Sequence, residues 1–188
     1  MRWSRDRLKS IGPNAFSGCN KLVSADIPKG VSEIGHHAFS WCDSLKSVNI
    51  PKGVTIINDF AFHRGCYTSV TVPNGVKSIG RDAFSWGRKL ESVSLPEGLE
   101  SIGKFAFYNQ VLTSLVIPSS VKKLEQEAFC GCGNLTEVTM LGERPESDKN
   151  IFGGCGKLKA IHVPANAKSW AGMKEWLGIP LVFDAARK

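Results

Sequence analysis

The sequence predicts a solenoid of stacked coils, because one phrase recurs along most of its 188 residues. The phrase reads IPKGVTIINDFAF in Ile50 to Phe62, and related phrases begin at Ile27, Val72, Leu95 and Ile117. Its closing phenylalanine recurs at steps of 23, 23, 22, 23, 22 and 23 residues, as Phe16, Phe39, Phe62, Phe84, Phe107, Phe129 and Phe152. Self-similarity at a fixed period indicates coils that each contact only their neighbours.

The length of the repeat narrows the fold class. A period of 20 to 29 residues is typical of leucine-rich repeats, so we predict a leucine-rich-repeat solenoid of about seven coils of 22–23 residues. It should have a parallel β-sheet on its concave face, an irregular convex side with a phenylalanine spine, and a short helical cap at its C-terminus. Residues 1–188 then form one domain, with a truncated first coil (1–21), the repeats (22–164) and the cap (165–188).

The first limb of each coil is predicted to be a strand. Leu45 to Pro51 shows the pattern L-x-x-V-x-I-P, in which apolar residues alternate at the end of the limb. Alternation with a period of two indicates a strand with one buried face. Stacked coils would place these strands about 4.8 Å apart in a parallel sheet. The proline ends each strand because it has no N–H for the next ladder bond.

The second limb, G-V-x-x-I-G-x-x-A-F, is expected to return over the convex side. Each phenylalanine ring can stack on the equivalent ring of the next coil, and the small alanine beside it lets the neighbouring backbone approach closely. Two coils are one residue short, between Phe62 and Pro73 and between Phe107 and Pro118, and we place both deletions in the turn before the strand. Residues 142–148 lose the apolar pattern and are expected to loop out.

The two ends of the array differ. The sequence begins in the middle of a coil, which favours a fragment of a longer protein. In the alternative, Trp3 folds over an uncapped N-terminal edge. Two chains could associate end to end through that edge. After Pro164, the spacing of Trp170, Met173, Trp176 and Leu177 predicts a helix that ends at Gly178. Leu181 to Phe183 is a candidate last strand.

Composition and charge restrict the class of partner. The net charge is +7, and residues 1–95 carry 13 Lys and Arg against 7 Asp and Glu. This half favours anionic partners, although a solvated surface is the plainer interpretation. There is no run of basic residues and no nucleic-acid motif. No apolar run is long enough to span a membrane, and the charged start MRWSRDRL is not a secretory signal.

These residues resemble the BspA-like leucine-rich repeat family. Its unit, L-x-x-V-x-I-P-x-x-V-x-x-I-G-x-x-A-F-x-x-C, is followed almost position for position by Leu45 to Cys66, and the resemblance covers residues 8 to 164. Known members are mostly bacterial and protist surface proteins, and some are adhesins. The resemblance implies a secreted or cell-surface location, with a cytoplasmic one left open. It supplies no catalytic residues.

Neither the cysteines nor the histidines suggest a catalytic or metal site. Four of the six cysteines fall three residues after a spine phenylalanine, so we expect reduced thiols that face the core. A disulfide between Cys19 and Cys42 stays open, because one coil separates them. Cys130-x-Cys132 is a poor zinc pattern. The histidines fall at predicted surface positions, and no glycine-rich phosphate loop is present. We therefore expect no enzyme, cofactor or metal.

Two surfaces are candidates for binding. Trp41 and Trp86 lie two residues after a spine phenylalanine and two coils apart, with Arg64 at the same position between them and Arg88 close in sequence. The alternative is the concave face, a smooth hydroxyl-rich surface that includes Asn49, Thr71 and Ser94. Trp and Arg are typical of binding hot spots. A plainer interpretation is that the indoles lie flat on their coils and do nothing else.

The expected function is therefore non-enzymatic. A protein- or glycan-binding repeat module, for adhesion or recognition at a cell surface, fits the exposed Trp and Arg side chains and the basic first half. The partner would be a protein or an anionic glycan. The alternative is a structural spacer or assembly segment of a larger surface protein, with no ligand of its own.

Overall fold

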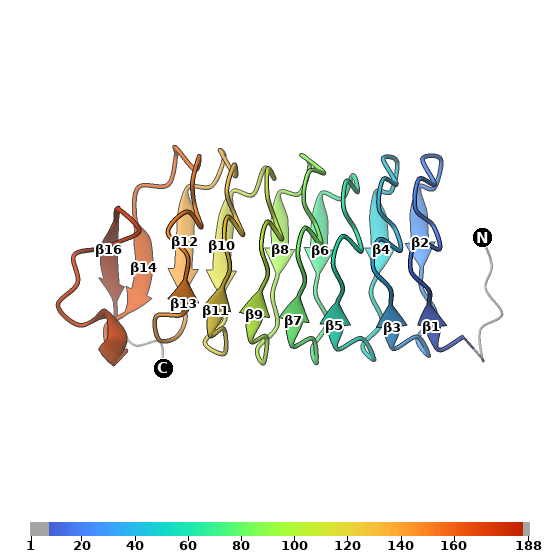
Figure 1. Cartoon of the computed structure of the whole chain (residues 1–188). Helices are drawn as coiled ribbons and strands as arrows, with labels where there is room; N and C mark the ends of the chain where they lie inside the picture. Colours follow the sequence, from blue (N-terminus) through green and yellow to red (C-terminus); the bar gives the residue numbers. More distant parts are fainter. Residues whose placement is uncertain (1–7, 186–188) are drawn as a thin grey trace.

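The computed structural model describes residues 8–185, in which the chain forms a β-solenoid (Figure 1). Each coil has a longer and a shorter strand. The longer strands are β2 (Ser24–Asp26), β4 (Ser47–Asn49), β6 (Ser69–Thr71), β8 (Ser92–Ser94), β10 (Ser114–Ile117), β12 (Glu137–Met140), β14 (Ile161–Pro164) and β16 (Ile179–Asp184). The shorter ones are β1 (Ser10–Ile11), β3 (Glu33–Ile34), β5 (Ile56–Ile57), β7 (Ser78–Ile79), β9 (Ser101–Ile102), β11 (Lys123–Leu124) and β13 (Glu146–Ser147). The predicted solenoid is confirmed, with about eight turns rather than seven.

The longer strands pair in parallel at equal repeat positions, as Ser24 opposite Ser47 illustrates. Their ladder is interrupted between β4 and β6 and between β8 and β10. Both interruptions fall in the coils that are one residue short. A shorter turn changes where its strand meets the preceding one, so the regular ladder of hydrogen bonds breaks there.

The side predicted to be irregular carries a second parallel sheet, in the order β13-β11-β9-β7-β5. Glycine follows β7 and β9 and lets the neighbouring coil approach closely there, because a Cβ on Gly80 would lie 2.8 Å from the main-chain nitrogen of Asp59. The Gly80 N–H instead donates to the carbonyl of Ile57 at 2.7 Å. In the coil where Asn58 replaces this glycine, the side-chain amide donates to the carbonyl of Ile34 at 2.7 Å. That substitution coincides with the gap between β3 and β5.

The segment 142–148 does not loop out of the array as predicted. Strand β13 pairs in parallel with β11, with Glu146 opposite Lys123 and Ser147 opposite Leu124. The Glu146 N–H donates to the carbonyl of Lys122 at 2.8 Å. Main-chain hydrogen bonds to the neighbouring coil therefore hold the backbone in register, even though the side chains lack the apolar pattern.

The core is one continuous cluster of buried apolar residues that runs from Ile11 to Trp176. The seven repeat phenylalanines lie along it as a column of rings, with neighbouring centroids 5.1 to 5.9 Å apart and interplanar angles of 0 to 17°. Six of them are buried and Phe16, at the end of the column, is half-buried. Each of the five interior rings, from Phe39 to Phe129, therefore buries its faces against the rings of the coils before and after it.

The C-terminal helix predicted within residues 165–188 is wrong. Within its described part, residues 165–185, the segment forms no helix other than the 3-10 helix η1 (Lys168–Trp170), which is followed by β15 (Glu175–Trp176); β15 pairs antiparallel with β16. Gly172 and Gly178 adopt φ of 75° and 76°, values that end a helix rather than continue it. Trp176 packs edge-on against Phe152. Hydrogen bonds from β16 to β14 outweigh the weak propensity of a short isolated helix. The candidate strand at 181–183 is part of β16.

Candidate binding surface

One rim of the solenoid is formed by the turns between the spine phenylalanines and the longer strands. The residue two positions after each spine phenylalanine has a φ between 60° and 78°, in the left-handed region: Gly18, Trp41, Arg64, Trp86, Asn109, Gly131 and Gly154. Glycine adopts this conformation freely, whereas a bulky side chain is strained by about 1 kcal/mol or more. Three coils thus place Trp or Arg where three others have glycine.

The predicted patch exists as two Trp–Arg pairs. The Arg64 guanidinium carbon lies 4.2 Å from the ring centroid of Trp41, and its Nε donates to Asp43 Oδ1 at 3.2 Å. Arg88 lies 5.2 Å from the ring centroid of Trp86. The indoles remain 49% and 40% exposed. The prediction placed Arg64 between the two indoles; Arg64 stacks on Trp41, and the guanidinium over Trp86 is that of Arg88.

The aromatic rings next to Trp41 are not among the binding residues predicted from the sequence. His63 lies between Trp41 and Phe60, with ring centroids 5.9 Å and 5.7 Å away. The Arg81 guanidinium is 5.9 Å from the Phe60 centroid. We call the group of Trp41, Phe60 and His63 the first aromatic cluster. It joins two coils on one surface and carries guanidinium groups over both of its outer rings.

A second aromatic cluster has the same plan. Tyr108 lies between Trp86 and Phe105, with ring centroids 5.3 Å and 5.5 Å away. The Lys104 ammonium is 4.9 Å from the Phe105 centroid. Trp86, Phe105 and Tyr108 make up this cluster. Each member lies 45 residues after its counterpart in the first cluster.

A sequence signal for both clusters was available. AFSW occurs at residues 38–41 and again at 83–86, and FAF occurs at 60–62 and again at 105–107. The two members of each pair are 45 residues apart, the sum of one step of 23 residues and one of 22. The array therefore also has a longer repeat of 45 residues, which spans two coils, and the two clusters occur at this longer period.

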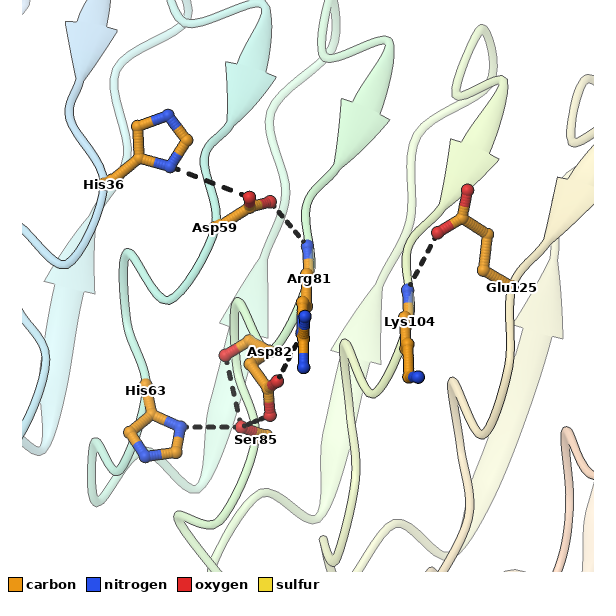
Figure 2. Close-up of polar contacts among 8 residues, drawn as sticks. All are labelled: His36, Asp59, His63, Arg81, Asp82, Ser85, Lys104 and Glu125. Atoms are coloured by element: carbon orange, nitrogen blue, oxygen red, sulfur yellow. Dashed lines mark hydrogen bonds and ion pairs between the residues drawn. The ribbon is translucent and has the colours of Figure 1, made fainter.

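Figure 2 shows polar contacts beside the first cluster. His63 Nδ1 lies 2.7 Å from Ser85 Oγ, and this hydroxyl donates to Asp82 Oδ1 at 2.8 Å. The hydroxyl, which is buried, sits between the imidazole and the carboxylate. In a nucleophilic triad the imidazole lies between the hydroxyl and the carboxylate. Here the hydroxyl lies in the middle, so the contact orients the His63 ring and does not have the order of a triad. Burial, with Arg64 nearby, lowers the pKa of His63 below its ordinary value.

Two carboxylates accept hydrogen bonds from the main-chain N–H groups of the residues that supply the outer cations, Arg81 and Lys104. Asp59 Oδ1 accepts the main-chain N–H of Arg81 at 2.8 Å, and Glu125 Oε2 accepts that of Lys104 at 3.2 Å (Figure 2). His36 Nδ1 lies 3.8 Å from Asp59 Oδ2. Because each bond joins adjacent coils, the backbones that carry Arg81 and Lys104 are anchored.

The alternative surface, predicted as the concave face, is carried by the longer strands. Asn49, Thr71 and Ser94 are exposed there, on β4, β6 and β8. Asn49 Nδ2 donates to Asp26 Oδ1 of the preceding coil at 3.3 Å. Val116, next in the column, is also exposed. In that column the described strands β2 to β12 carry no ring and no guanidinium, and the imidazole of His162 on β14, opposite Thr139, is the first ring.

The cysteines have a structural role in the turns. All six thiols are free, and burial raises the pKa of Cys42 to about 11. Three buried thiols donate to the carbonyl of the spine phenylalanine in the preceding coil: Cys42 to Phe16 at 3.1 Å, Cys132 to Phe107 at 3.4 Å and Cys155 to Phe129 at 3.4 Å. Gln110 replaces the thiol in its coil and donates to Phe84 O at 2.5 Å. Cys19 is exposed rather than core-facing, because within residues 8–185 no coil precedes its own.

Among residues 8–185, no group of three or more His, Cys, Asp and Glu side chains is placed to hold a metal ion. The same residues contain no helix with the length and apolar character needed to cross a membrane.

The repeat geometry agrees with a known sequence family. The profile of the BspA type leucine rich repeat region matches residues 4–67 and 55–172, in six copies. The chain belongs to this BspA-type family. Among curated proteins, no relative matches it.

Solved structures of bacterial leucine-rich repeat proteins share the fold. The pneumococcal vaccine antigen PcpA is 24% identical with a TM-score of 0.56, over 92% of this chain and 52% of its own. A T. pallidum leucine-rich repeat protein is 24% identical with a TM-score of 0.53, over 96% and 83%. A leucine-rich cell surface protein from Faecalibacterium prausnitzii is 18% identical with a TM-score of 0.51, over 98% and 71%. This BspA-type chain spans about half the length of the pneumococcal antigen.

Proposed function

We propose that this BspA-type array is a non-enzymatic module that binds a protein or an anionic glycan, in adhesion or recognition at a cell surface. The observation that carries the proposal is the pair of exposed Trp–Arg stacks, Trp41 with Arg64 and Trp86 with Arg88. Trp, Tyr and Arg dominate binding hot spots. The left-handed φ of both tryptophans supports the same conclusion, because strained residues concentrate at functional sites.

The surface location rests on the family resemblance and on two of the similar structures, which are described as a vaccine antigen and a cell surface protein. A spacer segment without a ligand is the second candidate. It is favoured by the pairing of Arg64 with Asp43, which satisfies part of the patch internally.

The double variant Trp41→Ala, Trp86→Ala tests the proposal against immobilised matrix proteins and sulfated glycans. We expect binding to fall at least about tenfold, since one hot-spot residue contributes 2 kcal/mol or more. Thermal melting should stay near the parent value, because both side chains are exposed. The matched control is Asn49→Ala, Thr71→Ala, Ser94→Ala on the longer-strand face. Loss of binding in this control, with full binding in the tryptophan variant, moves the site to that face; no specific binding by the parent favours a spacer.

A further inference from the structure

The two aromatic clusters are copies of one arrangement, shifted along the solenoid. In each, a tryptophan at the same turn position contacts a bridging ring, His63 or Tyr108, in the next coil. The bridging ring meets a phenylalanine edge-on, with interplanar angles of 71° and 83°. Translation by two coils relates the rings of the copies, whereas the cations come from different repeat positions: Arg64 lies in the coil after Trp41, and Arg88 lies in the coil of Trp86. A linear ligand that repeats at the same distance would therefore meet the rings of both clusters in the same way.

The distance between the clusters suggests what such a ligand looks like. Two coils correspond to about 10 Å, from a strand spacing of about 4.8 Å. A polyproline II helix has three residues per turn and rises about 3.1 Å per residue, so every third side chain returns to the same face after about 9 Å. An extended peptide of this kind, lying along the solenoid axis, would present one equivalent residue to each cluster.

The chemistry of the clusters favours a peptide that carries carboxylates. Arg64 and Arg88 lie over the two indole rings, so these cations occupy ring faces on which a sugar would stack. Asp43 holds Arg64 in place through Nε. A guanidinium so held is suited to binding a carboxylate through paired N–H donors. Exposed aromatic rings are the usual docking surface for proline-rich polyproline II segments.

Charge supports the same ligand class. Residues 1–95 contain the whole first cluster and also Trp86 and Arg88, and they hold 13 Lys and Arg against 7 Asp and Glu. An excess of positive charge raises the rate of encounter with an anionic partner. Arg81 and Lys104 add a cation over the outer phenylalanine of each cluster.

We propose that the two aromatic clusters are equivalent subsites for one extended, acidic, proline-rich peptide whose carboxylates recur at every third residue. This rests on the proposed binding function and specifies its ligand. Arg64 and Arg88 bind successive carboxylates, while the rings of the two clusters pack on the intervening prolines. Occupying both subsites makes the second contact intramolecular, so the peptide binds much more tightly than either subsite alone would allow.

The experiment measures fluorescence anisotropy of a labelled peptide of tandem Glu-Pro-Pro repeats, titrated with the full chain. A Gln-Pro-Pro repeat removes the charge and keeps the helix. A Glu-Pro-Pro-Pro repeat keeps the charge and rotates successive carboxylates onto different faces. We expect binding of the Glu-Pro-Pro peptide, at least about tenfold weaker binding of the four-residue repeat, and loss of binding with glutamine.

Single-site variants test the two subsites separately. Arg64→Ala and Arg88→Ala should each weaken binding of the Glu-Pro-Pro peptide about 10- to 100-fold and to a similar extent, because each removes one of two linked contacts. The combination Arg64→Lys, Arg88→Lys keeps the charge, removes the fork, and should also weaken binding. The matched control is Lys52→Ala, Lys122→Ala, which removes the same charge from exposed positions outside the clusters. It should bind like the parent.

Four outcomes overturn the inference. Equal affinity for the three-residue and four-residue repeats removes the spacing argument, and an unchanged affinity in either arginine variant removes one subsite. Binding of heparin oligosaccharides that depends on Arg64 and Arg88, without binding of the Glu-Pro-Pro peptide, replaces the peptide by a sulfated glycan and leaves the proposed function intact. Partner binding that survives the double tryptophan variant overturns this inference and moves the site to another face, whereas only the absence of specific binding by the parent removes the proposed function.

Discussion

Replacement of Phe84 by alanine should cost the folded state about 3 to 5 kcal/mol of unfolding free energy. Phe84 is 2% exposed, and its ring stacks between Phe62 and Phe107 at centroid distances of 5.3 Å and 5.4 Å. Loss of the buried ring removes about 2 to 3 kcal/mol of transfer free energy. Each lost stack adds about 0.5 to 1.5 kcal/mol. The cavity cannot close easily, because stacked coils hold both neighbouring rings in place.

Urea unfolding measures this cost, followed by far-ultraviolet circular dichroism and by tryptophan fluorescence. The two transitions must coincide, because a repeat array can unfold in parts. Phe84→Leu is the volume control and should cost less than about 1.5 kcal/mol. Phe16→Ala should cost about 1 to 2 kcal/mol, since the half-buried ring loses less transfer free energy. A cost below about 1 kcal/mol for Phe84→Ala, or equal costs at the two positions, would refute the role assigned to the column of rings.

Three further predictions concern the turns. Gln110→Ala should cost about 1 to 3 kcal/mol in urea unfolding, because it removes a buried amide that bonds Phe84 O at 2.5 Å and the Leu90 N–H at 3.2 Å; a cost near zero would show that the bonds contribute nothing. Thiol titration should count six free groups after unfolding without reductant, and a count of two or fewer would reveal disulfides. In the folded protein, exposed Cys19 should react well before Cys42, whose pKa is about 11. Burial lowers the folded-state pKa of His63, with Asp82, Arg64, His37 and Asp43 as the charged neighbours. The stability that neutral His63 contributes is therefore present above pH about 6.5 and is lost as the pH falls through the lower folded-state pKa. His63→Phe should reduce this acid destabilisation, and an unchanged pH profile would contradict the assignment.

Much of the architecture could be predicted because each coil is a local unit. Leu45 to Pro51 contains its own strand signal, and equal spacing of the phenylalanines implies that equal positions stack. The rim position of Trp41 and Trp86 follows from the same rule. Even the two missing residues, before Pro73 and before Pro118, mark where the longer-strand ladder is interrupted.

The C-terminal segment shows where local reasoning fails. Trp170 and Trp176 have a spacing that suits a helix, but β16 can form a parallel ladder with β14 and an antiparallel one with β15. Which structure forms depends on a neighbour that lies about 20 residues earlier in the sequence. A spacing pattern within the segment contains no information about that neighbour.

The sequence alone determined the solenoid, because one period of 22 or 23 residues dictates both the coil and its stacking on the next coil. The tertiary structure alone decided which side chains touch on the rim. Arg64 covers Trp41, Arg88 covers Trp86, and His63 joins Trp41 to Phe60. These contacts run between coils and depend on left-handed turns whose dihedral angles no residue pattern specifies, since tryptophan, arginine and glycine all occupy them. The candidate binding surface was therefore visible in the sequence as a list of residues, whereas the contacts between its rings and cations are visible only in the fold.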